Sequence, residues 1–250
     1  MRGTAPIKAF NFLFFALLAM FVSFMPVYLS DQGLNPARIG LITGTGGFIT
    51  IVAQPLWGMI SDRMRTVQKV LLLLVACSSA IGYFLYDSSS FGMLLLFAML
   101  MYFFLMPVDP LIESLNFRTA ERLGTSYGSI RTYGALGYAV MSLAVGYVMS
   151  YLGAGSLSWL FAGAGIVSLL VALLLPDAAV SGKPVTIASL RLFLSNRRTQ
   201  LFLLLIFISA VPQRINDTFL ASTSGSLAAS PSWSARPGSW PPAARLLSSR

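Results

Sequence analysis

Long apolar runs, separated by short polar segments, are the dominant pattern of this chain. A bilayer core of about 30 Å is crossed by about 20 apolar residues in an α-helix. Lipid-exposed backbone must satisfy its own hydrogen bonds, and the runs lack the period-two alternation of a membrane barrel. The pattern therefore predicts an all-α integral membrane protein whose first six helices form a bundle. We place these helices near residues 9–30, 41–60, 70–86, 91–114, 130–151 and 158–175, and a seventh near 201–220.

Composition agrees with a membrane protein and excludes several classes of site. Of the 250 residues, 56% are hydrophobic and 10% are charged, whereas an average soluble domain has about 25% charged residues. The chain has no histidine and a single cysteine, Cys77. Histidine-based catalysis, an internal disulfide and a cysteine zinc cage are therefore excluded. We expect no metal and no cofactor.

Basic residues lie mainly between the apolar runs, and they predict the orientation of the protein. If the N-terminus is cytoplasmic, the inner segments up to residue 200 hold twelve lysines and arginines, and the outer loops hold only Arg38. Cytoplasmic loops of membrane proteins are enriched in these residues. The net charge of +9 therefore indicates membrane topology rather than a nucleic-acid partner. We predict a multi-pass protein of the plasma membrane with a cytoplasmic N-terminus.

The same pattern divides the chain into four segments. We predict a six-helix bundle at 1–175, a basic cytoplasmic linker at 176–200, a seventh membrane helix at 201–220 and a tail at 221–250. The tail holds nine serines, six alanines, four prolines and three arginines but no acidic residue, a composition that cannot span a bilayer. It fits either a disordered tail or an out-of-frame translation that begins near residue 220. We favour the second interpretation.

Ionisable residues inside the apolar runs are the clearest candidates for a functional site. Such residues cost roughly 2.5–3.5 kcal/mol on insertion scales. Asp109 and Glu113 lie four residues apart near the inner end of the fourth run, so they share one helix face. Pro107 and Pro110 flank Asp109 and predict a kink there. Arg131 opens the fifth run and can pair with Glu113, either as a salt bridge that orients two helices or as part of a polar cluster facing a central cavity.

Two further polar groups are weaker candidates. Arg214 and Asp217 lie three residues apart in the seventh run and can pair on one helix face. The end of the second run contains Gly58, Asp62 and Arg63. A glycine permits close helix contact, and an acidic residue beside basic ones can form a cytoplasmic charge network that latches two helices together.

The second run and the loop after it resemble a signature of the major facilitator superfamily. The sequence QPLWG ends at Gly58 and continues into Ser61, Asp62 and Arg63. This is similar to the helix 2–3 signature of lactose permease-like oligosaccharide:proton symporters. Arg65 stands where that signature has a second glycine. The resemblance covers roughly residues 8–220 and implies the first half of a major facilitator fold with a partial seventh helix.

A second stretch, from Pro110 to Tyr138, resembles the lactose permease pattern without a gap. The resemblance implies that Glu113 and Arg131 hold sugar hydroxyls and that Tyr138 stacks on the sugar ring, where lactose permease has a tryptophan. Residues 26–29 also resemble the phenylpropionate permease group, which implies a carboxylated substrate held by Arg131. Asp109 is an addition to the pattern, and we count it among the substrate-binding candidates.

The resemblance implies secondary active transport of a small polar solute, sugar-like or an aromatic acid, in symport with protons. The coupling residues of these symporters lie mostly in the second half, so we expect this chain to be truncated and inactive alone. The alternative is a half-size membrane subunit that forms a homodimer or serves as a structural partner. A membrane-embedded enzyme would need a catalytic constellation, and the few ionisable residues within the spans do not supply one.

Overall fold

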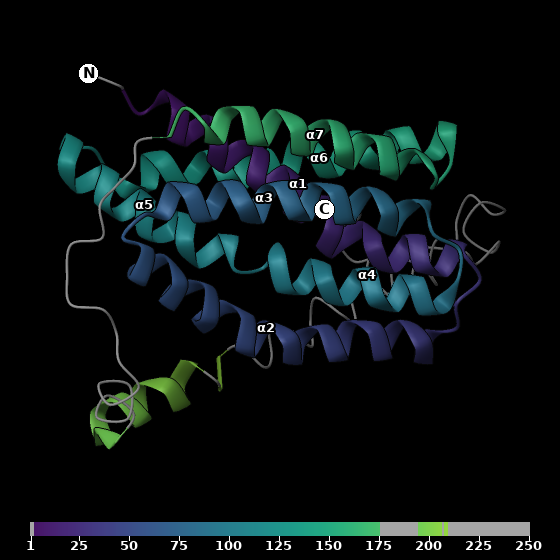
Figure 1. Ribbon diagram of the computed structural model, residues 1–250, viewed down its shortest axis with the longest axis horizontal. Coiled ribbons are helices and arrows are strands. Elements are labelled where there is room, and N and C mark those ends of the chain that lie inside the picture. The colour runs from purple at the N-terminus through teal and green to yellow at the C-terminus, as the bar shows by residue number, and fades with distance from the viewer. Residues whose placement is uncertain (1–2, 176–194, 207, 210–250) are drawn as a thin grey trace, which may run out of the picture. The chain divides into compact units, whose positions relative to one another are not determined.

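The computed structural model describes residues 3–175, 195–206 and 208–209. The chain divides into two compact units, Met1–Val185 and Thr186–Arg250, and each is described by itself. The regular structure of the described residues is helical. The described part of the first unit contains α1 (Ala5–Asp31), α2 (Pro36–Met64), α3 (Val67–Asp87), α4 (Phe91–Phe104), α5 (Val108–Leu123), α6 (Tyr127–Leu152) and α7 (Ser156–Ala172), as Figure 1 shows.

In the described part of the second unit, residues 197–206 and 208–209 are helical. It includes the beginning of the predicted seventh span. The remainder of that span, most of the predicted linker and the tail at 221–250 lie outside the described residues. The division of the chain at residues 175, 200 and 220 therefore stays a prediction.

The six predicted runs all fall on helices of the first unit. Within the described residues, five helical stretches are long and apolar enough to cross a membrane, when α4 and α5 are taken together as residues 91–123. The sixth, α7, is a shorter apolar helix of 17 residues. Two of the helices are longer than the apolar runs that predicted them. Both α1 and α2 continue into polar residues at each end. The predicted all-α membrane fold is confirmed.

The fourth run is broken rather than kinked. We expected one helix with a bend at Asp109, but α4 ends at Phe104 and α5 begins at Val108. Pro107 occupies the N-cap of α5, and because proline has no backbone N–H it cannot continue the ladder of α4. Pro110 lies in the first turn of α5, where the N–H has no intrahelical partner in any case. The break therefore falls before Pro107 rather than around Asp109.

The central helix of the bundle is α1. It packs between α6 and α7, while α4 packs between α2 and α3, and α3 also contacts α7. Figure 1 shows these helices running side by side along the bundle. The largest fully buried side chains include Phe10, Phe14 and Phe21 of α1. Because α1 is buried on several sides, its position constrains the helices around it.

Close contact between α1 and α6 depends on glycine. A Cβ added to Gly137 would collide with the backbone of Phe12, which cannot move without shifting α1. Gly146, farther along α6, would meet nothing within 4 Å. Small residues allow helix backbones to approach closely in lipid, where dispersion contacts drive association. Gly137 therefore sets the distance between the two helices, whereas Gly146 does not.

A buried amide pair joins α1 to α5. Asn11 Nδ2 donates to Asn116 Oδ1 at 2.7 Å, and Asn116 Nδ2 donates to Asn11 Oδ1 at 2.9 Å. Asn11 Nδ2 also lies 2.8 Å from the carbonyl oxygen of Ile7. Both side chains are fully buried. Reciprocal hydrogen bonds of this kind satisfy polar groups that would otherwise be stranded in an apolar interior.

We predict that Gly137→Ala destabilises the protein, whereas Gly146→Ala does not. Overpacking of a close contact costs roughly 1–3 kcal/mol, while alanine in an open helical position gains up to about 1 kcal/mol over glycine. The measurement is the thermal unfolding midpoint of each purified variant in detergent. Equal midpoints for the two variants would contradict the assigned contact between α1 and α6.

Candidate functional site

The site is built around an ion pair between α5 and α6. Arg131 Nε lies 2.6 Å from Glu113 Oε1, and the exposed side-chain fractions are 35% and 23%. The turn between the two helices positions these side chains. Gly124 caps α5 with a left-handed φ of 62°, and Thr125 N donates to the carbonyl oxygen of Ala120 at 3.0 Å, so the chain reverses within three residues. The predicted pairing of Glu113 with Arg131 is present in the structure.

A tyrosine that is stacked on a phenylalanine holds the carboxylate of this pair. The Tyr127 hydroxyl donates to Glu113 Oε2, so both carboxylate oxygens of Glu113 have partners. The Tyr127 ring is stacked on Phe117 with a centroid separation of 4.1 Å and an interplanar angle of 9°. The sequence pattern gave no reason to assign a role to either residue. The orientation of Glu113 is therefore fixed from both its own helix and the next.

The guanidinium of Arg131 lies against α1. Its Cζ is 4.1 Å from the centroid of the Phe15 ring, a geometry that attracts a cation to the ring face. Gly134, one turn after Arg131, leaves room for this contact, since a Cβ there would lie 2.6 Å from the Phe15 ring and 2.9 Å from Arg131 Nη1. The ion pair engages Nε, and the two Nη groups carry the remaining four N–H donors of a guanidinium.

Asp109 lies one turn before Glu113, in the first turn of α5. Its Oδ1 is buried and has no hydrogen-bond partner among the described residues. Together with Glu113 and Arg131 it gives the site two carboxyl groups and one guanidinium. A buried acceptor without a partner is costly. Asp109 is therefore the group of the site whose hydrogen-bonding capacity the described residues leave unused.

Tyr138 lies two turns after Arg131 on the same face of α6, about 10 Å farther along the axis. Its hydroxyl is 2.6 Å from Ser23 Oγ of α1. Ser23 was not a predicted residue, and its only signal in the sequence is a hydroxyl within an apolar run. The structure thus places Tyr138 on the same face of α6 as Arg131. The Tyr138 hydroxyl contacts α1 rather than Glu113.

The candidate gating residues lie at the C-terminal end of α2. A Cβ added to Gly58 would meet no atom within 4 Å among the described residues, so the close helix contact that we expected there is absent from the described part of the chain. Asp62 and Arg63 occupy the last turn of α2, and Arg63 is exposed. Their predicted role as a latch stays a prediction.

The backbone conformation of Arg65 explains why the signature has a glycine at this position. It adopts a left-handed conformation with a φ of 53°, and Thr66 N donates to the carbonyl oxygen of Ser61 at 3.4 Å. This is the pattern of a helix terminated by a left-handed residue, which is usually glycine. Here arginine takes the same conformation, and α2 still ends at Met64.

Two predictions concern features other than this site. Arg214 and Asp217, the candidate pair of the seventh helix, lie outside the described residues. Among the described residues, no group of three or more acidic or cysteine side chains is placed to hold a metal ion.

Ionisable side chains inside a multi-pass helical bundle commonly mark substrate or ion pathways. Comparison with known proteins agrees, because the model of the MFS_1 like family matches residues 5–229. The chain belongs to this family of major facilitator transporters. The resemblance to that superfamily in the sequence is confirmed.

Curated relatives of this chain are transporters. It is 27% identical over 225 residues to the uncharacterized transporter YwbF of Bacillus subtilis, covering 88% of this chain and 56% of that protein. It is 29% identical over 210 residues to a maltose permease of Geobacillus stearothermophilus, covering 83% of this chain and 53% of the relative. A raffinose permease of Escherichia coli is 28% identical over 173 residues, or 65% of this chain and 40% of the permease. The chain thus spans about half the length of the curated relatives that it matches.

A solved structure has the same fold. A mutant of the nucleoside transporter NupG superposes with a TM-score of 0.77 at 17% sequence identity, covering 93% of this chain and 60% of that one. At this identity, the likeness shows the fold alone.

We predict that Glu113 and Arg131 are energetically coupled. Removing one partner leaves a charge in a low-dielectric surrounding, so Glu113→Gln and Arg131→Gln should each lower the unfolding midpoint, and the double variant should lose less than their sum. Coupling of contacting residues is roughly 0.5–3 kcal/mol. A double-mutant cycle in detergent measures it, with the exposed residues Glu121 and Arg122 as a control cycle. Additive effects at Glu113 and Arg131 would refute the pairing.

Proposed function

We propose that this chain carries the first half of a secondary transporter and that the Glu113–Arg131 pair binds a hydroxyl-rich solute. The observation that supports this most strongly is the partly exposed ion pair, which is held in place by Tyr127 and Phe15. A carboxylate accepts and a guanidinium donates in fixed directions, so the pair suits neighbouring hydroxyl groups on a sugar ring. Tyr138 supplies an aromatic face on the same side of α6.

The ionisable groups of the site favour one of the two substrate classes that the resemblance implies, a sugar-like solute rather than an aromatic acid. Glu113 already balances Arg131, and Asp109 adds a second carboxyl group one turn away. An aromatic acid would have to compete with Glu113 for the guanidinium and would bring a third carboxyl group into the site. A neutral sugar meets neither penalty and can donate a hydrogen bond to Asp109. The relatives named for maltose and raffinose support the same class.

The proposal extends to orientation and coupling. The distribution of lysine and arginine supports a cytoplasmic N-terminus in the plasma membrane. Coupling to protons is proposed from the resemblance to the oligosaccharide:proton symporters.

Solute binding tests the proposal. Purified full-length chain is titrated in detergent with maltose, a ribonucleoside and phenylpropionate, and binding is followed by isothermal calorimetry. We expect binding of maltose or the nucleoside but not of phenylpropionate. Glu113→Gln and Arg131→Lys should each weaken binding about 10–100-fold, since each loses a hydrogen bond to a charged group worth roughly 1.5–3 kcal/mol.

Matched controls are available on α5. Glu121→Gln and Arg122→Lys change the same residue types at exposed positions and should bind as the native chain does. Unchanged affinity in the Glu113 and Arg131 variants would overturn the site. Tighter binding of phenylpropionate than of either sugar-containing solute would overturn the substrate class.

A second candidate is a half-size subunit that acts as a homodimer. The exposed fractions of Glu113 and Arg131 favour a site that is completed from outside the first unit. The stoichiometry of the purified chain in detergent, measured by light scattering with correction for bound detergent, decides this point. A dimer supports the second candidate, and a monomer that binds solute contradicts it.

A further inference from the structure

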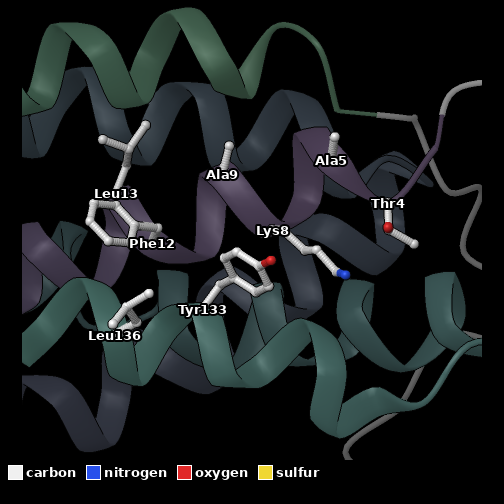
Figure 2. Close-up of a pocket in the computed structure, with 8 residues that line it drawn as sticks. All are labelled: Thr4, Ala5, Lys8, Ala9, Phe12, Leu13, Tyr133 and Leu136. Carbon is white, nitrogen blue, oxygen red and sulfur yellow. The ribbon is translucent and has the colours of Figure 1, made fainter.

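A groove of about 700 Å³ runs between α1 and α6 near the N-terminal end of α1. Its lining residues are Thr4, Ala5, Lys8, Ala9, Phe12 and Leu13 of the α1 segment together with Tyr133 and Leu136 of α6. Figure 2 shows the polar side chains at one end of this groove and the apolar ones at the other. Lys8 and Thr4 form the polar end, and Phe12, Leu13 and Leu136 form the apolar end. The groove is therefore amphipathic along its length.

The groove does not belong to the site at Arg131. At about 100° per residue, Tyr133 and Leu136 lie roughly 200° and 140° around α6 from Arg131. Arg131 points toward Glu113 of α5, whereas Tyr133 lies beside Lys8 of α1. A solute held by Arg131 and an occupant of the groove would therefore contact different faces of α6.

The polar end of the groove is suited to an anion. Lys8 is the one basic residue among those that line the groove, and none of them is acidic. Its Nζ lies 5.1 Å from the centroid of the Tyr133 ring, which restrains the ammonium group at the mouth of the groove. An ammonium group and the hydroxyl of Thr4 offer several hydrogen-bond donors to phosphate oxygens. Tyrosine and lysine are also the residues that anchor helices at the headgroup level.

The apolar end of the groove continues along α6 for the depth of one leaflet. Large apolar side chains follow one face of the helix at Tyr133, Leu136, Val140 and Leu143, with exposed fractions of 41%, 50%, 46% and 78%. From the first to the last of them the helix rises about 15 Å, at 1.5 Å per residue. That length is half of a hydrocarbon core of about 30 Å. An acyl chain that starts at the groove can lie along this face to the middle of the bilayer.

We propose that the groove binds one anionic phospholipid of the leaflet that borders the N-terminal end of α1. The phosphate group lies between Lys8 and Thr4, and an acyl chain follows Leu136, Val140 and Leu143. The charge of Lys8 selects an anionic headgroup over a zwitterionic one. Basic pockets between membrane helices bind lipid headgroups in this way.

Native mass spectrometry of the full chain tests the proposal directly, because it counts retained lipids. The protein is released from detergent after incubation with phosphatidylglycerol or with phosphatidylcholine of the same acyl composition. We expect one phosphatidylglycerol to be retained in preference to phosphatidylcholine. Lys8→Gln should weaken phosphatidylglycerol retention about five-fold, the contribution of one lysine at an anionic membrane surface, and should weaken phosphatidylcholine retention less, because the choline cation already offsets the charge of its phosphate.

Arg38→Gln is the matched control. Arg38 is also a basic residue whose side chain lies 5.1 Å from an aromatic ring, that of Phe91, but it does not line the groove. This variant should retain phosphatidylglycerol as the native chain does. Ala9→Trp fills the groove and keeps the charge of Lys8, so it should also lower retention.

Three outcomes would overturn the proposal. The first is equal retention of the two lipids by the native chain, and the second is undiminished phosphatidylglycerol retention in both Lys8→Gln and Ala9→Trp. The third is displacement of the bound lipid by millimolar inorganic phosphate, which would assign the site to a free anion. None of these measurements depends on solute binding at Arg131.

Discussion

The constraint on which the structure depends is the cost of a polar group in the apolar interior, a cost that is offset when the group finds a partner within the bundle. The Glu113–Arg131 pair satisfies this constraint where α5, α6 and α1 meet. Glu113 is held from α6 by Tyr127, and Arg131 rests on Phe15 of α1. The same rule accounts for the buried amide pair that joins α1 to α5. One of these polar clusters maintains the site and the other maintains the packing of the helices. Helix α1 takes part in both clusters.

Much of the fold could be predicted because hydropathy alone identifies segments that cross a bilayer. The six runs correspond to the helices of the first unit, and the cost of a buried charge is enough to pair Glu113 with Arg131 from their positions in the chain. The family followed from local residue patterns. One of these, the arginine at position 65 in place of glycine, acquires a physical explanation in the left-handed conformation that ends α2.

The remaining features could not be predicted, because hydropathy does not report how a helix is rotated or where it is interrupted. The break before Pro107 depends on which turn of a helix each proline enters. Tyr127 and Phe15 become part of the site only through the packing of α6 against α5 and α1. Gly58 was expected at a helix contact, but whether a glycine faces a neighbour is a property of the assembled bundle.

Two different faces of α6 contribute to the two proposed binding sites. One face carries Arg131 and Tyr138 toward the proposed solute site, and the other carries the apolar residues that follow the groove at Lys8.

The central claim, that Arg131 and Glu113 form a contact pair, is tested most directly by solid-state nuclear magnetic resonance on the chain in lipid. The measured quantity is the separation between Arg131 Nε and the side-chain carboxyl carbon of Glu113. The account predicts a separation of about 3–4 Å, as in a hydrogen-bonded ion pair, and a separation above about 6 Å would contradict it.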